Sequence, residues 1–364
     1  MMGQSVGPVL GGVITEFSGF RTIFWFLFGL GFIALVLIVL FLPETLRSIA
    51  GNGSVRLHGM DKPLVYLVKP QPSVLFEASE CRHSTRILTV KSIIYPLRFL
   101  FETDVFVTLF FGGVVYAVWS MVTSSTAFLF QSRFGLTDLE VGLIFLPNGA
   151  GCVLGSICTG YLLDRDFCIV ETQYRADKEI PDGNILNLAA LMDFPVAKSR
   201  LRSAWYLVLL FVAAVAGYGF AISSAALAEQ WGMTLPLVLQ FVISYTATSL
   251  FTQNSALIVD LYPGASAGGT AVNNLIRCSI GAAGVAVVQF MIDAIGAGLT
   301  FLTLASVTLG VTPLLWAELV WGGRWREKRM EKQLRKEAEH LGADGGERAP
   351  SSRCCEPTNS KGKA

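Results

Sequence analysis

Charged residues are scarce in this sequence: Asp, Glu, Lys and Arg make up 15% of the 364 residues, whereas 52% are hydrophobic. A soluble globular chain carries about 25% charged residues, and here long stretches have none at all. This shortage excludes a disordered protein, a collagen and a secreted disulfide scaffold, and it argues against an ordinary cytosolic enzyme. It indicates an all-α, polytopic membrane protein.

Histidine is also rare, and neither sign of charge dominates. The three histidines, His58, His83 and His340, lie far apart and lack the spacing of metal ligands, so we expect no enzyme activity, no metal and no cofactor. The net charge of +1 argues against a nucleic-acid partner. The expected partners are the lipid bilayer and a small-molecule substrate, and the protein itself is expected to be a monomer.

Seven stretches are long and apolar enough to cross a hydrocarbon core about 30 Å thick, which takes about 20 residues of helix. They are 22–42, 105–130, 141–163, 204–227, 233–260, 267–292 and 297–321. An eighth apolar stretch, from Gly3 to Ile14, has helical character but only about half the required length. The sequence is therefore expected to open part-way through a helix array.

Lysine and arginine gather on one side of the predicted membrane. Segments 43–103, 164–203 and 322–364 hold 8, 6 and 11 of the 28 basic residues, which places these segments in the cytosol by the positive-inside rule. No cysteine falls on the opposite side, so no structural disulfide is expected. We expect a multi-pass protein of the plasma membrane, with the vacuolar membrane as the alternative, and a silent glycosylation sequon at Asn52.

Glycines recur every fourth residue in the N-terminal half-span. Gly3, Gly7 and Gly11 share one helix face, which would let two backbones approach closely within lipid. Pro8 removes one internal hydrogen bond from the same helix. On spacing alone, a generic close-packed helix pair is the simpler interpretation.

Five motifs in order resemble the fungal quinidine-resistance and dityrosine-type drug:proton antiporters of the major facilitator superfamily. They are Gly3–Gly12, similar to the antiporter signature of the fifth helix; Leu42–Arg47, similar to the close of the sixth helix; Gly160–Arg165, similar to the second-half copy of the loop motif; Phe194–Arg202; and the paired runs Val259–Gly264 and Asn273–Cys278. The resemblance implies a major facilitator fold with a complete C-terminal six-helix half and a truncated N-terminal half.

The resemblance also implies the domain organisation. It predicts a remnant of the N-terminal half at 1–42, a central cytoplasmic loop at 43–103, a six-helix bundle at 104–321 and a cytoplasmic tail at 322–364. The first four helices of the family, which carry its usual proton-coupling carboxylates, have no counterpart. We expect either a gene model truncated at its 5′ end or a naturally shortened isoform.

The function implied by the resemblance is proton-coupled export of drugs or other small amphipathic molecules by alternating access. A truncated, transport-inactive fragment is the alternative, and a seven-helix receptor is a remote one. In the family, loop-motif residues hold helix ends together in one access state, a role that would fall to Gly160, Asp164 and Arg165. A solvated charged turn is the simpler alternative for Asp164 and Arg165.

Polar residues inside the spans are the candidate site residues, because burying them unpaired in hydrocarbon is costly. The family lines its cavity with the seventh and tenth helices, which correspond to spans 105–130 and 233–260. The cavity candidates are Tyr116, Trp119, Gln240, Ser244, Tyr245, Asn273 and Asn274. Hydrogen bonding between helices is the alternative role, and close packing is expected of Gly151 and Gly155.

Arg277 is the one basic residue well inside a predicted span, so it needs a partner or water. Asp260, at the cytosolic end of the preceding span, is the hypothetical partner. The alternative is that the Arg277 side chain reaches the membrane interface on its own.

Overall fold

The computed structural model describes residues 3–42, 102–179, 194–261 and 266–344, and within these every regular element is a helix. Several predictions lie outside the described residues. They concern most of the central loop including Asn52, the motif residues Pro43–Arg47 and Tyr262–Gly264, and the end of the tail.

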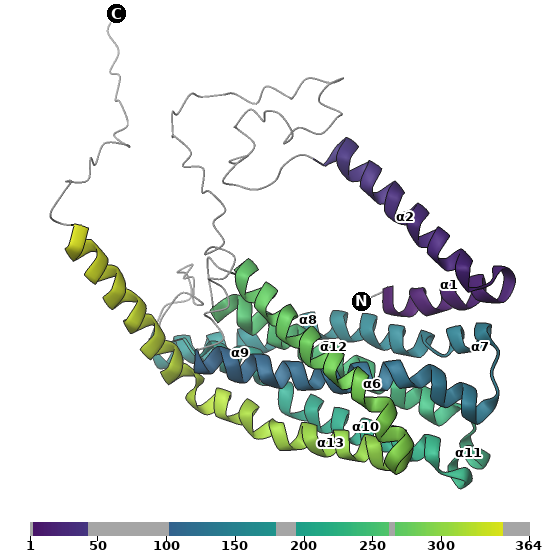
Figure 1. The fold of residues 1–364 in the computed structure, drawn as a ribbon. Helices are drawn as coiled ribbons and strands as arrows, with labels where there is room; N and C mark the ends of the chain where they lie inside the picture. The colour runs from purple at the N-terminus through teal and green to yellow at the C-terminus, as the bar shows by residue number, and fades with distance from the viewer. Residues whose placement is uncertain (1–2, 43–101, 180–193, 262–265, 345–364) are drawn as a thin grey trace, which may run out of the picture.

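The helices follow the predicted spans closely (Figure 1). They are α1 (Gly3–Ser18), α2 (Phe20–Phe41), α6 (Thr103–Phe134), α7 (Asp138–Leu143), α8 (Leu146–Asp177), α9 (Val196–Leu201), α10 (Ala204–Ser223), α11 (Ala225–Trp231), α12 (Thr234–Leu261) and α13 (Ser266–Asp344). Of the described helices, six are long and apolar enough to cross a membrane. This confirms an all-helical, multi-pass membrane protein.

Six helices correspond to seven predicted spans because α13 contains two of them. Gly296 has a φ of 79°, a left-handed conformation that glycine adopts without steric cost. The backbone therefore turns at this residue between spans 267–292 and 297–321 (Figure 1). Beyond the second span, α13 continues to Asp344 and reaches past the other helices.

The predicted span 141–163 differs most from the structure. Thr137 and Glu140 form a capping box that starts the short helix α7, and a separate helix, α8, begins at Leu146. α8 then continues to Asp177, because the end of an apolar run marks the membrane boundary and not the end of a helix. The predicted span 204–227 is too long, because α10 ends at Ser223 and α11 begins at Ala225.

The bundle is built around α6. This helix packs against α12 and α13, α12 packs against α8 and α10, and α10 packs against α13. A Cβ on Gly155 of α8 would lie 2.6 Å from the carbonyl oxygen of Tyr245 on α12, and one on Gly151 would clash with the carbonyl of Phe241. These contacts confirm the close packing that was expected of Gly151 and Gly155.

The N-terminal helices lie at the edge of the bundle. α1 packs on α7 and α8, whereas α2 projects away from them (Figure 1) and has no buried residue. The expected close packing at Gly3, Gly7 and Gly11 is not made with any described residue, because a Cβ at each would meet nothing within 4 Å there, so it stays a prediction. Gly12 makes the close approach instead.

The face of α1 that contacts α7 contains Gly12, the residue after Gly11 of the predicted face. A Cβ on Gly12 would lie 2.7 Å from the Asp138 carbonyl oxygen, and one on Gly142 of α7 would lie 2.8 Å from the carbonyl oxygen of Pro8. One residue turns a helix by about 100°. The four-residue glycine spacing therefore identified a small-residue helix but not the side that contacts its neighbour.

Candidate substrate-binding site

A guanidinium group and two aromatic rings meet where α6, α12 and α13 lie side by side. The Cζ atom of Arg277 is 4.7 Å from the ring centre of Tyr116 and 5.7 Å from that of Phe251. The two ring centres are 5.5 Å apart. A cation over an aromatic face within about 6 Å is attracted by the ring quadrupole, so the rings hold the Arg277 side chain against the bundle.

Arg277 retains hydrogen-bonding capacity in this position. Its Nη2 donates to Oδ1 of Asn274 at 3.0 Å, and its buried Nε has no partner among the described residues. A guanidinium carries five N–H donors in a fixed fork that matches a carboxylate. Because Arg277 is half-buried and Asn274 is exposed, an anion could reach this site from outside the bundle.

The expected Arg277–Asp260 pair is wrong. Oδ2 of Asp260 accepts from Nε of Arg200 at 2.7 Å, and the Arg200 guanidinium also lies 5.1 Å from the ring centre of Phe167. The Arg277 guanidinium lies beside Phe251 of α12. Phe251 precedes Asp260 by nine residues, so Asp260 lies about 14 Å further along the axis of α12. The closeness of Asp260 and Arg277 in the sequence therefore did not predict a contact between them.

A buried polar network lies behind the aromatic pair. Nε1 of Trp119 donates to Oγ of Ser244 at 3.3 Å, and the Ser244 hydroxyl bonds to Oδ1 of Asn148. The Trp119 ring also contacts Tyr116 and Phe251, with ring centres 5.7 and 5.8 Å away. This network joins α6, α8 and α12 directly beneath the Arg277 site.

Five of the seven cavity candidates divide into an accessible and a buried group. Tyr116 and Asn274 are partly accessible beside Arg277, whereas Trp119, Gln240 and Ser244 are buried. Neither amide atom of Gln240 has a partner in the described part of the chain. For the buried residues, contact with substrate stays a prediction.

The other two candidates sit in helix contacts. Tyr245 packs over Gly155, and Nδ2 of Asn273 donates to Oγ of Ser255 at 3.4 Å, which links α13 to α12. Asn273 and Asn274 are neighbours in sequence, yet only Asn274 bonds to Arg277.

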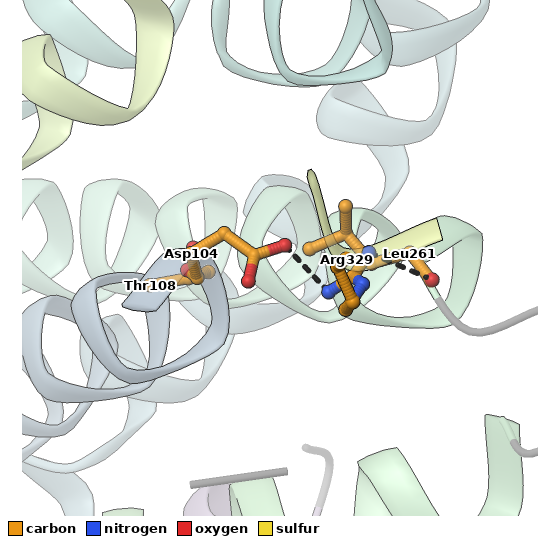
Figure 2. Close-up of polar contacts among 4 residues, drawn as sticks. All are labelled: Asp104, Thr108, Leu261 and Arg329. Atoms are coloured by element: carbon orange, nitrogen blue, oxygen red, sulfur yellow. Dashed lines mark hydrogen bonds and ion pairs between the residues drawn. The ribbon is translucent and has the colours of Figure 1, made fainter. Parts of the chain in front are cut away.

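A second charged cluster, missed by the sequence analysis, closes one end of the bundle (Figure 2). Nη1 of Arg329, late in α13, donates to Oδ2 of Asp104 at the start of α6 at 2.5 Å, and its Nη2 donates to the Leu261 carbonyl oxygen at 3.2 Å. Nη1 of Arg326 donates to the carbonyl oxygen of Phe194 at 3.0 Å. These bonds connect the late part of α13 to α6, to α12 and to Phe194, which lies two residues before α9.

The loop motif lies within a helix and does not form the turn given as its alternative. Gly160, Asp164 and Arg165 all lie within α8, and both charged side chains are exposed without an ion pair to another described residue. The carboxyl group that is buried belongs to Asp166, at 3% exposure. The gating role of the motif stays a prediction, and its turn geometry is corrected to helix.

Comparison with known proteins identifies the family. The family model described as Major Facilitator Superfamily matches residues 1–230. The chain belongs to the major facilitator superfamily. This confirms the family resemblance at that level.

Several curated relatives of this chain come from fungi. It is 47% identical to Citrate exporter 1 of Aspergillus niger over 93% of this chain and 63% of the relative. It is 31% identical to the MFS-type transporter phiL of a fungal species over 85% of this chain and 76% of the relative. The MFS antiporter QDR2 of Candida albicans is 29% identical over 84% of this chain and 58% of its own length. No solved structure matches the chain.

Proposed function

We propose that this major facilitator protein takes part in the export of small organic anions, and that Arg277 binds a carboxylate group of the substrate. The observation that carries the proposal is the half-buried Arg277 guanidinium, held on two aromatic rings and one amide with a buried N–H unused within the described structure. An ionisable residue inside a membrane span marks a functional site by default.

The chemistry of the site fits a carboxylate better than a neutral or cationic ligand. Arginine pairs with carboxylates through two parallel hydrogen bonds, which are charge-assisted and stronger than neutral ones. The 47% identity to a protein named a citrate exporter supports the same substrate class. The chain spans 63% of that relative's length. Anion export by this chain is therefore a proposal, which the experiments below test.

Alternating access and proton coupling complete the proposal. Export by rocking one half of a transporter against the other is the mode implied by the superfamily, and protons are the coupling ion implied by the antiporter resemblance. The plasma membrane is the proposed location. The end of the bundle that holds Arg200, Arg326 and Arg329 is proposed to face the cytosol, in agreement with the positive-inside rule.

Orientation can be tested with Cys168, which is exposed on α8 and free. In sealed plasma-membrane vesicles, a membrane-impermeant maleimide should label Cys168 from the cytosolic face alone. Because the chain has six other cysteines, the test uses a variant in which these are replaced by serine, and adding Cys168→Ser to that variant is the control that removes the signal. Labelling from the outer face would reverse the proposed orientation.

Binding tests the substrate class. Citrate should raise the apparent Tm of the purified chain in detergent, whereas neutral triethyl citrate should not. Arg277→Gln should weaken citrate binding about 10- to 100-fold, because one charge-assisted hydrogen-bond partner contributes about 1.5–3 kcal/mol. Arg133→Gln, at an exposed position on α6, is the matched control and should bind normally. Equal citrate binding by both variants would contradict the anion site.

Transport is measured as efflux of labelled citrate from cells that express the chain. Efflux that is lost in Arg277→Gln supports the proposal. Binding without efflux favours the alternative of a transport-inactive fragment. A cellular signalling response without any citrate efflux would favour the third alternative, a seven-helix receptor.

Drug export is the second candidate. The rings of Tyr116, Trp119 and Phe251 lie within 5.8 Å of one another by ring centres. Tyr116 is the partly accessible ring of the three, and an aromatic face of this kind can stack against an amphipathic molecule. The similarity to a protein named an MFS antiporter supports this candidate. Resistance to quinidine on expression, without citrate efflux, would favour it over anion export.

A further inference from the structure

Glu318 is a buried acid that the Arg277 site does not use. It lies on the second span of α13 with 1% of its surface exposed, and neither carboxyl oxygen has a hydrogen-bond partner in the described structure. A Cβ at Gly322, one turn further on, would lie 2.8 Å from Oε1 and 3.6 Å from Cβ of Ala197. The carboxyl group therefore fills a closed space between α13 and α9.

The charged groups that act on Glu318 come from two helices. Asp104 on α6 repels its ionised form, and Arg329 on α13 attracts it. The Arg329 guanidinium, however, is bonded to Asp104 and to the Leu261 carbonyl oxygen (Figure 2). Ala197, on α9, contributes an apolar contact at Gly322.

Two further arginines and one further acid lie near the Asp104–Arg329 pair. Arg326 lies within electrostatic reach of Asp104, Asp260 and Arg329, and Asp260 is paired with Arg200. Each of these charges has its own partner: Arg326 bonds to the Phe194 carbonyl. No described cation is bonded to Glu318.

The charged groups that act directly on Glu318 are thus Asp104 and Arg329, and the Arg329 guanidinium is bonded to Asp104 and not to Glu318. An ionised Glu318 would be a buried charge without a partner, which costs far more than a buried neutral acid. With a proton on Glu318, the charges of Asp104 and Arg329 balance.

We propose that Glu318 is a proton-binding site whose occupancy is controlled by the Asp104–Arg329 ion pair. While Arg329 is bonded to Asp104, Glu318 holds its proton on a carboxyl oxygen. When the pair opens, the unneutralised guanidinium favours the carboxylate, so the O–H bond of Glu318 breaks and the proton passes to water. This proposal rests on the proposed export function and assigns its proton coupling to a residue of this chain.

Infrared difference spectroscopy on the purified full chain tests the proton directly. The spectrum of wild type minus Glu318→Gln at neutral pH should show the carbonyl band of a neutral carboxylic acid. Glu327→Gln, an exposed acid on the same helix, is the matched control and should show loss of a carboxylate band instead. A carboxylate band in the Glu318 difference spectrum would overturn the proposal.

The control by the ion pair is tested with Asp104→Asn. This variant removes the repelling charge and leaves Arg329 unneutralised, so the Glu318 acid band should disappear at neutral pH. An acid band that persists in Asp104→Asn would overturn the coupling to the pair.

A stability measurement covers the case in which Asp104→Asn does not fold. Glu318→Gln copies the shape of the neutral acid, so its apparent Tm should equal that of wild type in acid and exceed it increasingly as the pH is raised. Parallel pH profiles would overturn the proposal. Neither readout uses a substrate, so loss of citrate binding in Arg277→Gln and failure of the Glu318 tests are separate results.

Discussion

Two arginines of the same helix, Arg277 and Arg329, have opposite surroundings. Arg329 is 4% exposed and ion-paired with Asp104, itself 1% exposed. Arg277 is half-buried, has no acid bonded to it in the described structure, and lies against Tyr116 and Phe251. The first has its charge compensated within the protein, whereas the second has a charge still available to a ligand.

This difference separates a structural arginine from a binding one. A buried ion pair contributes little net stability when formed, but removal of one partner leaves an uncompensated charge. An arginine held by rings can be replaced at small cost to the fold, because cation–π contacts are weaker. The four substitutions below test this distinction, in decreasing order of expected effect.

The largest effect is expected for Arg329→Met. The variant leaves Asp104 buried without a partner, which should lower the free energy of unfolding by about 3–5 kcal/mol. Thermal or denaturant unfolding of the purified chain in detergent measures this loss. Arg324→Met, at an exposed position on the same helix, should change stability by no more than about 0.5 kcal/mol.

The double variant Asp104→Asn with Arg329→Met sharpens this result. Removal of both charges should recover part of the stability lost in Arg329→Met, because the unpaired acid is gone. If the two losses simply add, Asp104 and Arg329 do not depend on each other.

Arg200→Gln should have an intermediate effect. Its pair with Asp260 has side chains that are 18% and 19% exposed, so the expected loss of about 1–2 kcal/mol lies between the limits for exposed and buried pairs. The unfolding assay used for Arg329→Met ranks the two variants. If Arg200→Gln lowers the free energy of unfolding as much as Arg329→Met does, the solvent exposure of an ion pair does not determine its contribution to stability.

The sequence predicted the spans well because apolar length alone specifies them. It also singled out Arg277, because a basic residue within a span stands out. It could not predict the partners: whether Asp260 or Phe251 is level with Arg277 depends on how α12 and α13 are aligned, and this is set by packing.

The Asp104–Arg329 pair was beyond sequence reasoning for a related reason. Arg329 is one of 11 basic residues in the segment 322–364, and nothing local distinguishes the one that turns into the bundle. Glu318 was noticeable as an acid inside a span, but its lack of a hydrogen-bond partner is a property of the packed helices. Both the Asp104–Arg329 pair and the unpartnered state of Glu318 in the described structure depend on how the helices pack, which the order of residues in the sequence does not reveal.

Arg277→Met should change stability less than either ion-pair variant. Loss of its contacts with Tyr116 and Phe251 is expected to cost about 0.5–1 kcal/mol, while citrate binding is lost. Unfolding and citrate-induced Tm shifts on the same preparation give both values. A stability loss near that of Arg329→Met would mean that Arg277 is structural and that the anion site is wrong.

The smallest effect is expected for Tyr116→Leu. The substitution keeps apolar volume beside Gly281, where a Cβ would lie 2.8 Å from the Tyr116 ring, but it removes one of the two faces that hold the guanidinium. Citrate affinity should fall about 2- to 5-fold, because an aromatic contact of about 0.5–1 kcal/mol no longer orients Arg277. Titration of the purified variant with citrate measures this change. Phe106→Leu, an exposed ring on the same helix, is the control and should leave the affinity unchanged, so an equal fall in both would show that Tyr116 does not position Arg277.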